Sequence, residues 1–375
     1  MATERLSIRA EPYSRVCVVG AGAWGTALAG VARRSGREVS LWGRDAEVLE
    51  AIATRRENPR YLPGIELPAG IRTTTDIASA LDGAEAVLIV TPSRTLRDIC
   101  RMIAPHLSPH VPVTLCAKGI EQGSGLLLTE VAGAELPGHS IGALSGPTFA
   151  HETALGHPTA ATVAFPFGHE DRQEPSRSVA ARVAVSMSSD SFRPYISDDL
   201  IGVEIGGAVK NVIAIACGMM TGAGFAENTR AALITRGMNE MKKLAEALGG
   251  RRETVTGLSG AGDLVLTCSS QTSRNMSLGV QLGQGIPRDQ CFEGRPVVVE
   301  GEVNAVSVVQ LARRIHVPMP ICEAVHAILH EGVPLKVAFA QVWSRPITAE
   351  PQDLDISLTQ PTDREAIDAY TERFQ

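Results

Sequence analysis

Residues 15–34 read RVCVVGAGAWGTALAGVARR and contain the pattern that decides the fold. A short apolar segment leads into Gly20, Gly22 and Gly25, and a stretch that reads as a helix follows. At such a turn the first glycine permits the sharp change of direction, the second lets a pyrophosphate approach the backbone, and the third lets the helix pack on the strand. We therefore predict that this turn binds a dinucleotide, whose phosphates face the free N–H groups at the helix start.

Around this turn, short β-rich segments alternate with longer helical ones. Strands are expected at residues 38–43, 86–90, 111–119, 140–145 and 159–165, and helices at 46–56 and 95–107. Continuously apolar segments such as 86–90 are typical of strands covered on both faces. The order predicts the α/β class, with a Rossmann-type doubly wound parallel sheet at the N-terminus. The polar residues 166–178 are expected to form an exposed loop.

The pattern changes at Asp198. Residues 201–220 are apolar and rich in small side chains, and 228–250 have the three- and four-residue spacing of a helix. An all-α C-terminal domain is therefore expected after the sheet. We predict a dinucleotide-binding domain at 1–197, a helical substrate domain at 198–347 and a loosely ordered tail at 348–375.

The composition excludes several classes of protein. Of the 375 residues 44% are apolar, so the chain should fold, and its length suggests two domains. With 35 Lys and Arg against 41 Asp and Glu, the net charge of −6 provides no basic field for nucleic acid. Seven cysteines without a Cys-x-x-Cys pair indicate a reducing, cytoplasmic setting. We expect no signal peptide and no membrane span. His326 and His330 lack a third ligand, so no metal site is predicted.

The end of the second predicted strand indicates which dinucleotide binds. NAD sites usually carry an acid there for the ribose 2′-hydroxyl, whereas an arginine accommodates the 2′-phosphate of NADP. This strand ends Trp42-Gly43-Arg44-Asp45, so the arginine precedes the acid. We therefore favour NADPH as the cofactor, that is NADP(H), and keep NADH, that is NAD(H), as the alternative.

Two lysines are candidates for the chemistry. Within six residues of Lys210, every residue except Glu204 and Asn211 is apolar or glycine. A lysine held away from water gives up its proton readily, as a carbonyl reduction requires, although a lysine that extends to the surface fits the same pattern. Lys118 follows a predicted strand, at the sheet edge where ligands bind in doubly wound folds. The alternative for Lys118 is a solvated loop residue.

Three further segments could bind oxygen atoms of a substrate. Residues 145–150, SGPTFA, form a turn after a strand and have backbone N–H groups free to bind. Asp263 lies in a glycine-rich turn, and Ser273-Arg274-Asn275 has the composition of a helix start that could grip a phosphate. A plain helix cap followed by a surface arginine explains the last segment equally well. These residues predict a nicotinamide oxidoreductase with a phosphorylated substrate.

With these segments in view, the chain resembles the bacterial NAD(P)-dependent glycerol-3-phosphate dehydrogenase family. The resemblance lies in GAGAWGTALA, ALSGPTFAHE, GGAVKN, NTRAALITRGMNEM, GLSGAGDLVLTC, SRN and VVVEG, and spans residues 15–347. It implies that dihydroxyacetone phosphate is reduced reversibly to sn-glycerol 3-phosphate for glycerophospholipid synthesis, with Lys210 as the catalytic proton donor and acceptor. The implied substrate residues are Lys118, Gly146, Thr148, Lys210, Asp263, Ser273, Arg274 and Asn275. The implied cofactor residues are Gly20, Gly22, Ala23, Trp24, Gly25, Arg44, Lys118, Ala150, Arg274, Val298 and Glu300. A homodimer is also implied.

Two departures from the family pattern and two alternative functions remain. The polar residues 166–178 and the tail after Ile347 look longer than is usual in the family. Family members commonly carry a hydroxyl residue where this chain has Ala117, which affects a contact behind Lys118. A related two-domain hydroxyacid or phosphogluconate dehydrogenase would share the Rossmann domain and a catalytic lysine, but the SRN and GAGDLVLTC segments speak against it. A non-catalytic NADPH sensor is disfavoured because Lys118, Lys210 and Asp263 are all present.

Overall fold

The computed structural model describes residues 9–350 and 356–358. They form two compact units: the described residues up to Gly207 together with Leu248–Asp263, and Ala208–Ala247 together with the described residues from Leu264 onward. The predicted division at residue 197 stays a prediction, and most of the predicted tail at 348–375 lies outside the described residues. Each unit is described separately below.

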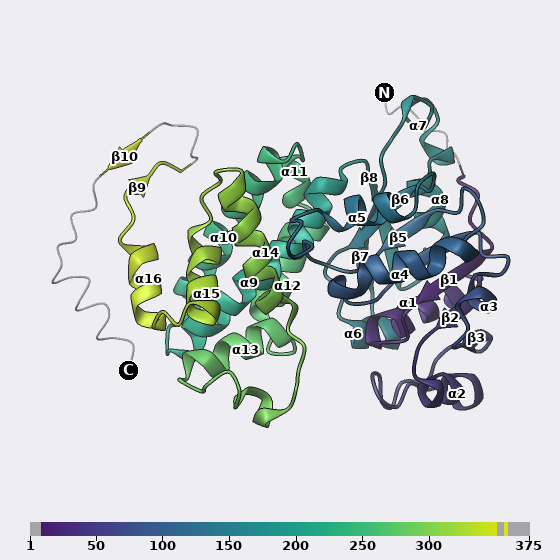
Figure 1. Cartoon of the computed structure of the whole chain (residues 1–375), viewed down its shortest axis with the longest axis horizontal. Helices are drawn as coiled ribbons and strands as arrows, with labels where there is room; N and C mark the ends of the chain where they lie inside the picture. The colour runs from purple at the N-terminus through teal and green to yellow at the C-terminus, as the bar shows by residue number, and fades with distance from the viewer. Residues whose placement is uncertain (1–8, 351–355, 359–375) are drawn as a thin grey trace. The chain divides into compact units, whose positions relative to one another are not determined.

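The first unit contains an eight-stranded sheet in the order β3-β2-β1-β4-β5-β6-β7-β8 (Figure 1). All neighbours pair in parallel except β6 and β7, which are antiparallel. Strand β1 lies between β2 and β4, so the strand order reverses direction at β1. In doubly wound sheets ligands bind beyond the carboxyl ends of the strands at such a point. The strands are β1 (Arg15–Val19), β2 (Glu38–Trp42), β3 (Ile71–Thr74), β4 (Ala86–Ile89), β5 (Val113–Leu115), β6 (Ile141–Ser145), β7 (Thr159–Ala164) and β8 (Phe192–Ser197).

Helices cover both faces of this sheet, as Figure 1 shows. Along β1, Val16 and Val18 pack into a cluster with α1, α2 and α8, whereas Cys17 and Val19 pack on the other side with α3, α4 and α5. Alternate residues of a strand face opposite sides, so an uninterrupted apolar strand is what two covered faces require. The helices are α1 (Ala23–Arg34), α2 (Ala46–Arg55), α3 (Ile77–Leu81), α4 (Leu96–Ile103), α5 (Leu128–Glu135), α6 (Ala150–Leu155), α7 (His169–Gln173), α8 (Val179–Ser186) and α11 (Arg252–Val255).

The predicted Rossmann-type sheet is confirmed, with local corrections. The expected loop at 166–178 contains α7 and a 3-10 turn at Pro175–Arg177. The edge strand β8 includes Pro194, and β3 reads IRTT. Prolines and short polar strands occur at sheet edges, where one side needs no ladder hydrogen bond, and both segments therefore lacked the apolar signal of the central strands.

The second unit is helical, as predicted. Its longest helix, α9, begins in the first unit at Leu200, where the Asp199 carboxylate accepts a hydrogen bond from Gly202 N at 2.9 Å. Close approach of α9 and α13 depends on glycine: a methyl group at Gly218 would lie 2.3 Å from Met276 O. The elements are α9 (Leu200–Gly222), α10 (Glu227–Ala247), α12 (Asp263–Ser269), α13 (Arg274–Gly283), α14 (Glu300–Arg314), α15 (Pro320–His330) and α16 (Leu335–Trp343), followed by the paired β9 (Ile347–Thr348) and β10 (Ser357–Leu358).

Helix α9 is also the one helix of the described residues with the length and composition of a membrane span. Its most apolar window is 89% buried inside the protein. Burial of that extent is what a core helix shows, since a spanning helix must present its apolar side chains to lipid.

Candidate functional site

The glycine turn between β1 and α1 has the shape that a dinucleotide needs. Gly20 has φ of +122°, and a side chain there would lie 2.7 Å from Val90 O. A methyl group on Gly25 would lie 1.8 Å from Gly20 O, so α1 can pack here only without a side chain. Around Gly22, by contrast, nothing lies within 4 Å of the position of a methyl group. The turn is therefore closed behind the first and third glycines and open at the second, where a pyrophosphate is expected.

The start of α1 leaves backbone donors for that phosphate. Gly22 is the N-cap residue and has no side chain to accept from the first N–H groups of the helix, which lack intrahelical partners. Ala23 and Trp24, the first two helical residues, pack with Ala150, the first residue of α6, against one small apolar cluster. The structure thus brings together three of the predicted cofactor residues, although Trp24 also serves as a packing residue.

At the end of β2, the predicted arginine and its neighbouring acid are in different situations. Asp45 caps α2 by accepting from Val48 N at 3.2 Å, and it pairs with Arg60 at 2.7 Å. The hydrogen bond from Val48, followed by that from Arg60, lowers the pKa of Asp45. Arg44 is exposed. The acid at this strand end therefore has a structural task already, whereas the arginine remains accessible to solvent.

Lys118 and Asp263 form a buried ion pair. Lys118 lies three residues after the end of β5, and its Nζ donates to Asp263 Oδ2 at 2.5 Å and to Gly146 O at 3.4 Å. The Asp263 side chain is 3% exposed and that of Lys118 15%. Thr148 Oγ1 also donates to Gly146 O, at 3.2 Å. Four predicted substrate residues are therefore neighbours, and Lys118 is not the solvated loop lysine of the alternative interpretation.

Lys210 is buried on α9, with 6% of its surface exposed. Its Nζ donates to Thr267 Oγ1 on α12 at 2.9 Å. Lys210 therefore does not extend to the surface, and one partner of its ammonium is a neutral hydroxyl. Thr267 was not among the predicted site residues. The one sequence feature that could have indicated it is a hydroxyl side chain between the apolar residues Leu266 and Cys268.

The start of α13 confirms the predicted helix cap. Ser273 accepts from Met276 N at 3.3 Å, and the exposed Arg274 donates to Val298 O at 3.0 Å, so two residues predicted to touch the cofactor are in contact. Asn275 is buried, and its amide nitrogen donates to Asn211 Oδ1 at 2.9 Å.

The Asn275 amide is also engaged through its oxygen, which accepts from Gly301 N at 2.9 Å. On the other side, Asn211 Nδ2 donates to Glu300 Oε2 at 3.4 Å. Asn275 thus joins α13 to α9 and α14, close to the predicted cofactor residue Glu300. Asn211 belongs to the quoted GGAVKN segment but received no predicted role, because an asparagine after a lysine has no distinctive spacing.

His326 and His330 face each other on α15 with ring centroids 5.3 Å apart. No group of three or more His, Cys, Asp or Glu residues that could hold a metal ion occurs within the described part of the chain. His326 is partly buried beside Glu331 rather than fully solvated, since its side chain is 13% exposed.

The fold and these residues indicate a class of protein: a dinucleotide-dependent oxidoreductase, in which Lys210 is buried and Lys118 pairs with Asp263. Comparison with known proteins identifies the family. The family described as NAD-dependent glycerol-3-phosphate dehydrogenase matches with its N-terminal part at residues 15–170 and its C-terminal part at residues 199–340. The chain belongs to this family.

Individual relatives align with almost the whole length of this chain. It is 48% identical over 335 residues to the glycerol-3-phosphate dehydrogenase [NAD(P)+] of Rhodospirillum rubrum, covering 89% of this chain and 93% of the relative. The corresponding protein of Caulobacter vibrioides is 49% identical over 338 residues, with 90% and 99% covered. The crystal structure of glycerol-3-phosphate dehydrogenase from Coxiella burnetii aligns with a TM-score of 0.81 at 35% identity, covering 89% of this chain and 99% of that one. The predicted family, the enzyme class and the NAD(P)(H) cofactor are confirmed, whereas the roles of single residues stay predictions.

Proposed function

We propose that this chain reduces dihydroxyacetone phosphate to sn-glycerol 3-phosphate with NAD(P)H, reversibly, and so supplies the backbone of glycerophospholipids. The observation that carries the proposal is the buried Lys210, held by the neutral Thr267 hydroxyl in a chain of this family. A lysine that donates a proton must keep its Nζ in a fixed position and away from bulk water, and both the burial of Lys210 and its hydrogen bond to Thr267 support this role.

In the proposed mechanism Lys210 donates its proton to the carbonyl oxygen of the substrate and takes it back in the reverse reaction. NAD(P)H, when bound, supplies the hydride that reduces the carbonyl carbon. Thr267 fixes the Nζ position in either protonation state, since a hydroxyl can donate as well as accept.

Lys118 is proposed to stabilise the negative charge that develops on the same oxygen. Its side chain is held in one rotamer by Asp263 and Gly146 O, so little reorganisation is needed when the charge appears. Asp263 holds the ammonium in place by pairing with it. Gly146 and Thr148 complete this part of the substrate site in the proposal.

The substrate phosphate is assigned to Ser273, Arg274 and Asn275. A guanidinium binds a phosphate through two parallel N–H groups, and the start of α13 adds backbone N–H donors. Arg274 also donates to Val298 O, and this contact supports a shared role of the arginine in substrate and cofactor binding.

The residues that would hold the cofactor are the glycine turn with Gly20, Gly22 and Gly25 and its neighbours Ala23, Trp24 and Ala150, together with Arg44 and Lys118. We propose a preference for NADP(H), because Asp45 is occupied as a helix cap while Arg44 is accessible for a 2′-phosphate. A cytoplasmic location is proposed as well: all seven cysteines are buried and none forms a disulfide, as in a reducing compartment. A homodimer is proposed from the family resemblance.

The proposal is tested by following NADPH consumption by the purified full-length chain with a panel of carbonyl substrates. Dihydroxyacetone phosphate should be reduced, and dihydroxyacetone without the phosphate should be reduced at least about 100-fold less efficiently, because the charged contacts to phosphate are absent. Equal rates with the two ketones would contradict the assignment of the phosphate site. In the reverse direction, with NADP+ as the oxidant, preferred oxidation of 6-phosphogluconate over sn-glycerol 3-phosphate would point to the related dehydrogenase class instead.

A further inference from the structure

The segment that carries Lys118 is the connection between β5 and α5, residues 116–127. Its distal part closes on itself, because Ile120 and Leu127 form an antiparallel bridge and Glu121 N donates to Leu126 O at 3.0 Å. Lys118 is thus only two residues from a rung whose other side, Leu127, directly precedes α5. We therefore expect a shift of the α5 start to reach the lysine through this rung.

A buried carboxylate on α9 holds that helix start. Glu204 accepts from Thr129 N at 3.0 Å and from the Thr129 hydroxyl, and Thr129 is the second residue of α5. Glu130 accepts from Leu127 N at 2.7 Å and completes the cap. Glu204 is 9% exposed. Because water has little access to its carboxyl group, the protein itself must supply the hydrogen-bond partners.

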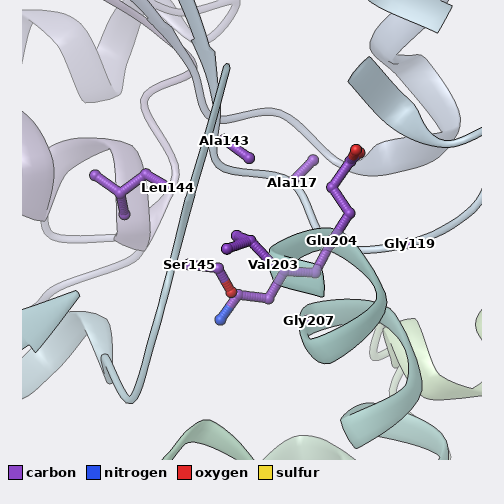
Figure 2. A pocket seen from close by; sticks show the side chains of 9 residues that line it. Ala117, Gly119, Ala143, Leu144, Ser145, Val203, Glu204 and Gly207 are labelled. Atoms are coloured by element: carbon purple, nitrogen blue, oxygen red, sulfur yellow. The ribbon is translucent and has the colours of Figure 1, made fainter. Parts of the chain in front are cut away.

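The same turn of α9 also approaches Lys118 directly. Gly207 lies three residues after Glu204, and a methyl group added there would come within 3.2 Å of both Lys118 Cγ and Ser145 Oγ. Figure 2 shows the pocket that results, with Glu204 and Gly207 on one helical turn and Ser145 on the neighbouring strand. Lys118 lines this pocket too, and within the described residues Ser145 Oγ has no hydrogen-bond partner there.

Burial raises the pKa of Glu204 to about 7, the hydrogen bonds from Thr129 lower it, and the nearby Glu130 carboxylate raises it. A neutral carboxyl group is therefore well populated at neutral pH. This makes glutamine a close substitute for Glu204, since it keeps the size and can accept from Thr129 N while donating to the hydroxyl.

We propose that Glu204 is a positioning residue for Lys118: it fixes the start of α5 on α9 and thereby the segment that holds the lysine against Asp263. The inference rests on the role of Lys118 in the proposed function. Removing the carboxyl group leaves the partly buried N–H of Thr129 without this partner at the start of α5, and the segment must move to find water. A displacement of about 1 Å at a catalytic group can reduce the rate about 100-fold.

The test is a double-mutant cycle on the full chain with Glu204→Ala and Lys118→Ala, read as kcat/KM for dihydroxyacetone phosphate. We expect Glu204→Ala to lower kcat/KM by about 10- to 100-fold. The double variant should be no worse than Lys118→Ala alone, within about 3-fold, because both changes remove the same contribution. Glu204→Gln should restore activity to within about 3-fold of the wild type. Should Glu204→Ala not fold, Glu204→Asp replaces it, since it keeps the charge but withdraws the oxygens from Thr129.

The matched control is Glu240, a second buried carboxylate, which caps α15 by accepting from Ile321 N at 2.7 Å and Cys322 N at 3.3 Å. Glu240→Ala should lower the melting temperature but change kcat/KM by less than about 3-fold. The inference is overturned if Glu204→Ala keeps wild-type kcat/KM, if the two losses multiply in the double variant, or if Glu240→Ala reduces kcat/KM as much as Glu204→Ala. If Lys118→Ala has wild-type kcat/KM, both the proposed role of Lys118 and this inference are overturned. If kcat/KM falls in Lys118→Ala but not in Glu204→Ala, only the inference is overturned.

Discussion

Replacing Gly22 and Gly25 by alanine should separate cofactor binding from folding. A methyl group on Gly25 would meet Gly20 O at 1.8 Å, whereas the same group on Gly22 has no atom within 4 Å. The first contact is with backbone and cannot be relieved by a side-chain rotation. The methyl group on Gly22 fits the protein but enters the space through which a pyrophosphate approaches the start of α1.

The magnitudes follow from these contacts. Gly22→Ala replaces an N-cap glycine and should lower the free energy of unfolding by no more than about 1 kcal/mol. If it displaces one N–H hydrogen bond to a charged phosphate, about 1.5–3 kcal/mol of binding is lost, which corresponds to roughly 10- to 100-fold in the Kd of NADPH. Gly25→Ala should instead lower the free energy of unfolding by about 3 kcal/mol, because α1 must move off the strand.

Two assays distinguish the outcomes: denaturant unfolding without cofactor, and titration of NADPH followed by its fluorescence. Gly22→Ala should unfold near the wild-type midpoint and bind NADPH weakly, whereas Gly25→Ala should be destabilised in the absence of NADPH. If Gly22→Ala bound NADPH with wild-type Kd, the pyrophosphate would not lie at this glycine, and the reasoning would be refuted.

Three further predictions concern charged residues. Arg44→Ala should raise the KM for NADPH about 10-fold and leave that for NADH within about 2-fold, because only NADPH carries the 2′-phosphate; equal effects on both would exclude this contact. Arg274→Ala should raise the KM for dihydroxyacetone phosphate at least about 10-fold, and an unchanged KM would remove Arg274 from the phosphate site. Burial raises the pKa of Glu240 from 4.5 to about 7, so its contribution to stability is present at low pH and is lost as pH rises through 7. Since one pKa unit corresponds to about 1.4 kcal/mol, the wild type should lose on the order of 3 kcal/mol relative to Glu240→Gln between pH 4 and pH 8, and parallel pH curves from denaturant unfolding would contradict the burial argument.

Local patterns allowed the central part of the fold to be predicted from sequence. The glycine turn, the apolar central strands and the Ser273 cap each depend on residues close together in the chain, and each has a known backbone requirement. The edge strands β3 and β8 could not be recognised, because an edge position relaxes the demand for apolar side chains and tolerates Pro194.

Long-range contacts in the site could not be predicted in the same way. Lys118 and Asp263 are 145 positions apart, and no property of either segment indicates the other. Thr267 and Asn211 were missed because a single hydroxyl or amide in an apolar helix has the same pattern whether it packs, caps or holds a functional group. Family resemblance supplied the roles of residues such as Val298, for which the chain itself has no chemical signal.

The central claim is that the buried Lys210 transfers the proton in the reduction of dihydroxyacetone phosphate. The most direct measurement is kcat of Lys210→Ala with saturating dihydroxyacetone phosphate and NADPH, together with the Kd of NADPH for the same variant. General acid catalysis of this kind contributes about 100- to 10,000-fold, so kcat should fall by that factor while the Kd changes by less than about 3-fold. A folded Lys210→Ala variant with kcat within about 3-fold of the wild type would contradict the account.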